Sequence, residues 1–98
     1  PNGLHVILHQ DNSTPIVNVS VLYHVGSKNE PKGRTGFAHF FEHLMFEGSP
    51  NIERGTFFKI LQNAGGTLNA NTSFDRTFYY ETLPSHYLEL GLYMESER

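Results

Sequence analysis

Residues 36–47 would form a helix that is apolar around almost its whole circumference, and this pattern constrains the fold more than any other feature of the chain. The flanking residues fit such a helix, because Thr35 can cap its start, Gly48 can end it, and Pro50 follows directly. A helix that is apolar on all sides is expected to be buried inside a larger assembly rather than to lie on a surface. Ionisable side chains within it therefore require a reason.

Those ionisable side chains are His39, Glu42 and His43. Helix positions four apart lie one above the other, so the two imidazoles can hold one metal ion between them. Glu42 shares that side of the helix, which places its carboxylate beside the ion, in the position of a general base. The order is H-x-x-E-H, the inverted form of the zinc-peptidase motif H-E-x-x-H. The alternative interpretation is a hydrogen-bonded polar cluster without a metal.

The composition permits one globular domain and excludes several kinds of partner. With 98 residues, the chain is at the small end of the domain range and can bury only a limited core. The net charge is -3 and no basic run is present, so a nucleic-acid partner is not expected. Without cysteine, any metal must use nitrogen and oxygen ligands. No membrane span or signal segment is evident, and a start at Pro1 suggests a trimmed chain.

Period-2 and helical patterns on both sides of the motif predict an α+β fold. The clearest strand pattern places Val17, Val19 and Val21 on one face. We predict strands at residues 4–8, 16–25, 67–72 and 77–83, and further helices at residues 53–63 and 86–98.

Several sequence blocks carry a resemblance to a known family. They are Asn-Gly-Leu at residues 2–4, Tyr-His-Val-Gly-Ser at 23–27, the motif region at 33–48, Gly-Gly-Thr-Leu-Asn-Ala at 65–70 and Asp-Arg-Thr-Phe-Tyr-Tyr at 75–80. In this order they resemble the start of the insulinase, or pitrilysin, family of metallopeptidases, which includes the mitochondrial processing peptidases. The resemblance implies that residues 1–98 are an incomplete, N-terminal part of a catalytic domain. It also implies part of the family's α/β roll, an antiparallel sheet with helices packed on one side.

The resemblance also implies roles for individual residues. His39 and His43 would bind Zn²⁺, and Glu42 would activate the metal-bound water that hydrolyses peptide bonds in extended or unfolded peptides. Asn69 and Ala70 would lie near the substrate, which would add to their strand as an extra strand. A turn or bulge role for Asn69 fits the sequence equally well.

The third zinc ligand of the family is a glutamate on a downstream helix, and the matching position lies beyond Arg98. Glu89, Glu95 and Glu97 precede that position, and we predict that they form a solvated face. A catalytic zinc normally has three protein ligands. We therefore expect weak or no zinc binding, and no activity, from residues 1–98 alone.

Three functional classes compete on this reading. The first is a zinc endopeptidase, or the part of one that bears the motif. The second is a non-catalytic subunit of the same family, although such subunits usually lack part of the motif. The third is an interaction domain whose histidines cluster by accident, which the linked blocks disfavour. The expected partners are peptide substrates and the remainder of the peptidase or a homologous subunit, and uncovered apolar faces predict self-association.

Overall fold

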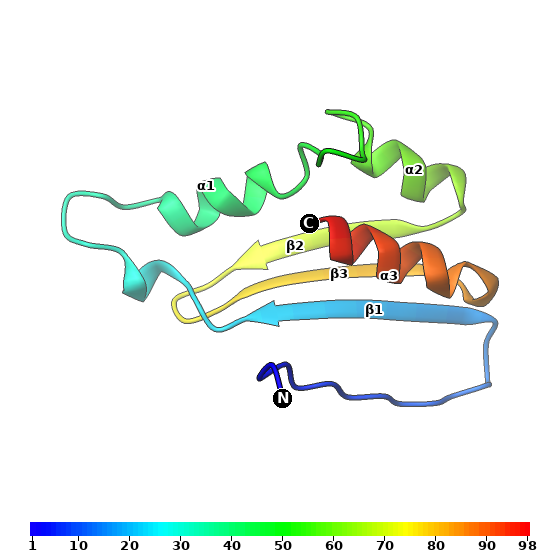
Figure 1. Cartoon of the computed structure of the whole chain (residues 1–98). Coiled ribbons are helices and arrows are strands. Elements are labelled where there is room, and N and C mark those ends of the chain that lie inside the picture. The colour runs from blue at the N-terminus through cyan, green and yellow to red at the C-terminus, as the bar shows by residue number, and fades with distance from the viewer.

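The chain forms a three-stranded antiparallel sheet covered by helices, in a computed structural model that describes residues 1–98 (Figure 1). The sheet order is β1-β3-β2, so β3 lies in the centre and β2 lies at an edge. This arrangement confirms the predicted α+β class. The elements are β1 (Ile16–Tyr23), η1 (Ser27–Asn29), α1 (Phe37–Leu44), α2 (Phe57–Asn63), β2 (Thr67–Thr72), β3 (Thr77–Pro84), η2 (Ser85–Tyr87) and α3 (Leu88–Glu97).

All three helices pack on one face of this sheet. Along β3, burial alternates strictly, and Glu81 and Leu83 belong to the buried set. A Cβ atom added to Gly91 of α3 would lie 3.0 Å from side-chain atoms of Glu81, Leu83 and Val19, which shows how closely α3 approaches that face. Leu61 of α2 shares a buried cluster with Leu83, and α1 contacts β2. The opposite face of the sheet carries no helix.

The apolar core lies between α2, α3 and the sheet, at some distance along the chain from the motif helix. It consists of Ile52, Phe57, Leu61, Leu83 and Met94. Burial of each such side chain typically contributes about 1.5 to 3 kcal/mol. None of these residues belongs to α1, but Phe46, two residues after that helix, packs against this core.

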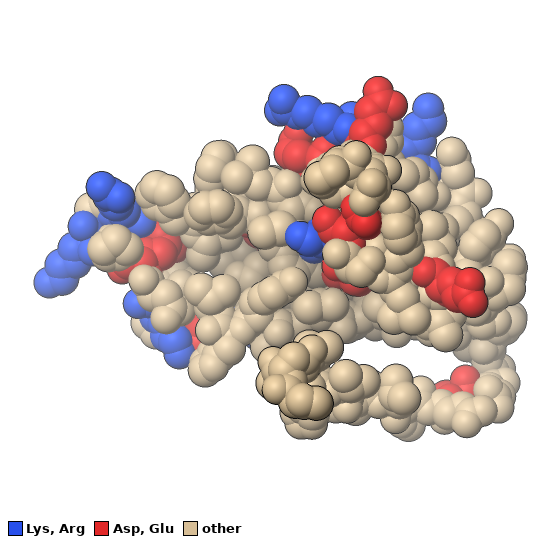
Figure 2. All heavy atoms as spheres, viewed as in Figure 1, with Lys and Arg blue, Asp and Glu red and all other residues tan.

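The predicted strand at residues 4–8 is wrong. Residues 1–15 contain no regular element and run alongside β1 without pairing, separated from the rest of the molecule over much of their length (Figures 1 and 2). Leu4 and Leu8 are 71% and 91% exposed. Alternating apolar residues stabilise a strand only when a neighbour completes the hydrogen bonds and a layer covers one face. This segment has neither.

The predicted helix at residues 36–47 is present but shorter, and the expectation that Thr35 caps it is wrong. Its regular part ends at Leu44, after which the N–H groups of Phe46 and Glu47 turn to carbonyls three residues back. Thr35 does not cap the start, because Gly36 occupies that position with φ +88°. Within residues 1–98 the helix is largely exposed, so its burial in a larger assembly stays a prediction. Its exposed apolar side chains are Phe37, Phe40, Phe41 and Leu44.

The remaining predicted elements are present, and most of them differ from the structure by a few residues at one end. The prediction for residues 67–72 matches β2, and the prediction for residues 77–83 falls one residue short of β3. The predicted helix at residues 53–63 begins only at Phe57, because Gly55 adopts φ +79°, a left-handed conformation that interrupts a helix. The last helix opens with the 3₁₀ turn η2. No helix of the chain combines the length and apolarity that crossing a membrane demands.

Candidate metal centre and active site

The two motif histidines meet on one side of α1. Their Nε2 atoms lie 3.0 Å apart, and their ring centroids are separated by 4.7 Å. Two nitrogen ligands of a tetrahedral zinc, each bonded at 2.0–2.1 Å, lie about 3.3 Å apart. The imidazoles of His39 and His43 therefore fit adjacent corners of a zinc site. A hydrogen bond between neutral rings has a similar spacing, which leaves the metal-free polar cluster for experiment to test.

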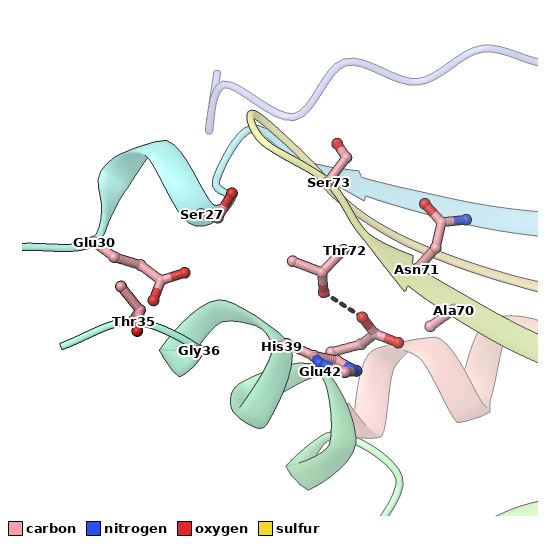
Figure 3. Close-up of a pocket in the computed structure, with 10 residues that line it drawn as sticks. All are labelled: Ser27, Glu30, Thr35, Gly36, His39, Glu42, Ala70, Asn71, Thr72 and Ser73. Carbon is pink, nitrogen blue, oxygen red and sulfur yellow. Dashed lines mark hydrogen bonds between the residues drawn. The ribbon is translucent and has the colours of Figure 1, made fainter.

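Glu42 lies on the inner side of the same helix. It is the only buried residue of α1, with 8% of its surface exposed. One carboxylate oxygen, Oε2, accepts a hydrogen bond from the hydroxyl of Thr72 at the end of β2 (Figure 3). Figure 3 shows the side chains of Glu42 and His39 next to each other in the space between α1 and β2. The helix thus presents the Glu42 carboxylate beside the His39 imidazole, on the side that faces β2 (Figure 3).

Two sets of contacts place the start of α1 relative to the sheet. Glu30 Oε2 accepts a hydrogen bond from the Phe37 N–H at 3.0 Å, which satisfies a free donor at the helix start. The 3₁₀ turn η1 before it is fastened to the β2–β3 turn, because the N–H of Ser27 donates to the Ser73 carbonyl at 3.1 Å. Gly26 permits this contact, since a Cβ atom there would lie 2.3 Å from the same carbonyl oxygen.

An open pocket of about 470 Å³ lies between η1, the start of α1 and the end of β2 (Figure 3). His39 and Glu42 line it from the helix, and Ala70 and Thr72 from the strand. His43 is adjacent to His39 but does not line the pocket. The remaining lining residues are Ser27, Glu30, Thr35, Gly36, Asn71 and Ser73.

The two residues predicted near the substrate lie in the middle of edge strand β2, but they face opposite ways. Ala70 pairs with Tyr79, whose side chain is buried on the helix side, whereas Asn69 pairs with Tyr80 and is exposed. The regular pairing shows that the alternative of a turn or bulge at Asn69 is wrong. Its side-chain Oδ1 accepts a hydrogen bond from the Ala70 N–H at 2.9 Å.

The free edge of β2 offers hydrogen-bonding groups beside the pocket. The Ser73 N–H donates to the Arg76 carbonyl, which makes these two residues a hydrogen-bonded pair that closes the hairpin. In an antiparallel ladder such pairs alternate with pairs whose N–H and C=O groups point away from each other. Thr72 and Ala70 are one and three positions before Ser73 in the register, so both belong to the second kind of pair. Their backbone N–H and C=O groups therefore point to the free edge.

A buried charged cluster next to the site escaped the sequence-based prediction. Glu81 is fully buried, and the side chains of Glu95 and Arg98 are 6% and 1% exposed. The Arg98 guanidinium lies 3.3 Å from the Glu95 carboxylate and 4.4 Å from the ring centre of Tyr79. The predicted solvated face is therefore wrong for Glu95, whereas Glu89 is exposed. The alternating pattern of residues 77–83 could have indicated that Glu81 is buried, because position 81 falls on the covered face.

Burial dominates the electrostatics of this cluster. Desolvation, with repulsion from Glu95 as the second cause, raises the pKa of Glu81 to about 8. Burial likewise raises the pKa of Glu95 and lowers the pKa of Arg98. The pKa of Tyr79 rises to about 12, first because of burial and also because Glu42 lies close enough to repel a phenolate. Tyr79 thus lies between the cluster and the candidate active site.

The chain holds no group of three histidine, cysteine, aspartate or glutamate side chains that could bind a metal ion. Glu97 is engaged elsewhere, because its carboxylate accepts hydrogen bonds from Ser49 and Asn51. Residues 1–98 therefore bring together two imidazole nitrogens that could serve as metal ligands and, on the same helix, one carboxylate.

Comparison with known proteins gives concordant matches. Residues 5–95 match the family model described as Insulinase (Peptidase family M16). Zinc protease PqqE of Helicobacter pylori is 48% identical over 80 residues, which cover 81% of this chain and 18% of that protein. The mitochondrial-processing peptidase subunit beta of Blastocladiella emersonii is 36% identical over a stretch that covers 94% of this chain and 20% of that protein. The crystal structure of a protease from Helicobacter pylori superimposes with a TM-score of 0.82 at 43% identity, and the match covers 86% of this chain and 20% of that one. The chain spans about a fifth of these relatives.

Proposed function

Because the chain belongs to the insulinase family of peptidases, family M16, we propose that residues 1–98 are the motif-bearing, N-terminal part of the catalytic domain of a zinc metallopeptidase. The observation that carries this proposal is the convergence of the His39 and His43 Nε2 atoms at 3.0 Å on the helix that also holds the buried carboxylate of Glu42. A zinc ion held there would supply Lewis-acid polarisation of the peptide carbonyl and of the attacking water. A glutamate outside residues 1–98 would complete the ligand set.

Glu42 is proposed as the general base and then the general acid of the hydrolysis. Its carboxylate takes a proton from the attacking water and passes it to the leaving amine. The free oxygen Oε1 is available for this role, since Oε2 is engaged by Thr72. Glu42 lines the pocket, so its carboxylate is accessible to a substrate bound there.

The substrate is proposed to be an extended or unfolded peptide that pairs with the free edge of β2. The edge-directed N–H and C=O groups of Ala70 would provide main-chain hydrogen bonds, which require little of the substrate's sequence. Asn69 would release the Ala70 N–H, to which its side chain is bonded in the structure, and bond the peptide instead. Most backbone groups of a folded substrate are already hydrogen-bonded within it, so extended peptides are favoured.

The apolar surface of α1 is proposed to pack against the remainder of the peptidase or a homologous subunit. Phe40 and Phe41 are more than half exposed in residues 1–98, which is costly for side chains of this size. One relative is by name the beta subunit of a processing peptidase. In isolation the chain is expected to self-associate through this surface.

The test uses the full-length protein that carries this segment, with zinc content and cleavage of an unfolded peptide as separate measurements. Glu42→Gln should retain zinc but lower kcat by about 10²- to 10⁴-fold, as expected for the loss of a general base. His39→Ala should lose both zinc and activity. Glu53→Gln, an exposed position before α2, provides a matched control. Full turnover by the Glu42→Gln variant, or a wild-type protein without zinc, would refute the proposal.

A further inference from the structure

The side chain of Glu42 is tied to the sheet by a single residue of β2. The Thr72 hydroxyl donates a hydrogen bond to Glu42 Oε2 across the gap between helix and strand (Figure 3). The two residues are 30 positions apart in the chain, so the bond is a tertiary contact rather than a local one. It joins the only buried residue of α1 to the last residue of the edge strand.

The register of the sheet explains why Thr72 makes this contact. Thr72 lies on the helix-facing side of β2 together with Ala70, two residues before it. Its cross-strand neighbour Thr77 directs its own hydroxyl elsewhere, to the Val25 carbonyl at 2.9 Å. A β-branched residue has few χ1 options, so the strand backbone fixes where the Thr72 hydroxyl points.

We propose that Thr72 is a positioning residue for the peptidase reaction, holding Glu42 Oε2 so that Oε1 faces the attacking water. This inference rests on the function proposed above. A carboxylate that rotates freely offers its reactive oxygen in the productive direction only part of the time, whereas a held carboxylate is already aligned. Because β2 would also pair with the peptide, one strand would position both the substrate and the Glu42 carboxylate. The bond therefore fixes the distance between the peptide carbonyl and Glu42.

The test compares three threonine variants in the full-length, zinc-loaded protein. Thr72→Val keeps the shape of the side chain but removes the hydroxyl, and Thr72→Ser restores the hydroxyl. Thr67→Val is the matched control, because Thr67 is an exposed threonine at the other end of the same strand. Zinc content and circular dichroism report on the integrity of each variant, and steady-state kinetics separate kcat from KM.

Thr72→Val should lower kcat by about 10- to 100-fold, with KM within about twofold of wild type and zinc content unchanged. Thr72→Ser should recover kcat to within about threefold, and Thr67→Val should match wild type. If Thr72→Val does not fold, Thr72→Ala against Thr72→Ser provides the same comparison. An active wild type with an unaffected Thr72→Val, or a serine variant as slow as the valine variant, would overturn the positioning role alone. An inactive zinc-loaded wild type would overturn the proposed function and this inference with it.

Discussion

Replacing Glu81 with glutamine should make local stability much less dependent on pH. Glu81 is fully buried in β3, and its pKa is raised to about 8 by desolvation and by repulsion from Glu95. In the unfolded chain a glutamate titrates near 4.3. Between these values the unfolded state has released its proton and the folded state has kept it. Stability is therefore fully present at acidic pH and is lost as pH rises towards 8.

The size of this loss follows from the proton affinities. Since each tenfold change in proton affinity corresponds to about 1.4 kcal/mol, the wild type should lose at most roughly 3 to 4 kcal/mol between pH 5 and pH 8. Glutamine has nearly the same shape and does not titrate. We expect Glu81→Gln to gain at least about 1.5 kcal/mol relative to wild type over this range.

Hydrogen–deuterium exchange of the full-length protein measures this effect locally. At each pH, the exchange rates of variant and wild type are compared as a ratio for peptides from β3 and α3. The intrinsic pH dependence of exchange is the same for both proteins, so it cancels in this ratio. The ratio of the wild-type exchange rate to the variant exchange rate should be at least tenfold larger at pH 8 than at pH 5. Glu89→Gln, an exposed position on α3, should show equal ratios at both values. Equal ratios for Glu81→Gln would refute the reasoning that burial suppresses its ionisation.

Two further predictions concern packing. Leu61→Ala should lower the free energy of unfolding by about 2 to 5 kcal/mol, because Leu61 is fully buried in the core, whereas the exposed Leu92→Ala should change it little in the same thermal unfolding experiment. Gly26→Ala should detach η1 from the β2–β3 turn, because the new Cβ would lie 2.3 Å from the Ser73 carbonyl oxygen, and the measurable result is faster exchange of the Ser27 amide. An unchanged exchange rate would contradict that account of Gly26.

The sequence predicts elements well where local pattern and tertiary partners coincide. Residues 67–72 and 77–83 alternate regularly and are joined by a short turn, so each finds its partner next to it in the chain. Residues 4–8 alternate just as well, but they form no hydrogen-bonded pairs with edge strand β1, which they run beside (Figure 1). The α+β class and the helix that carries His39, Glu42 and His43 could therefore be predicted. The unpaired N-terminal segment could not.

Tertiary packing explains what the sequence does not reveal about the site. The spacing of His39 and His43 is local, and one helical turn suffices to bring the two rings together. The contact of Glu42 with Thr72 depends on how α1 rests against β2, which no local pattern encodes. The burial of Glu81 depends on the close approach of α3 at Gly91. Charged side chains in a covered position are recognised only once the covering element is known.

The central place of β3 in the sheet has a consequence for the order of events during synthesis. Within residues 1–98, both β1 and β2 pair with β3 alone, so this three-stranded arrangement cannot form until Thr77–Pro84 has left the ribosome. Helix α1 emerges earlier, and eight residues are too few for a stable helix in water. The two motif histidines of the nascent chain therefore lack a rigid frame until the β2–β3 hairpin closes beneath them. Under the proposed function, zinc binding should follow that closure rather than guide it.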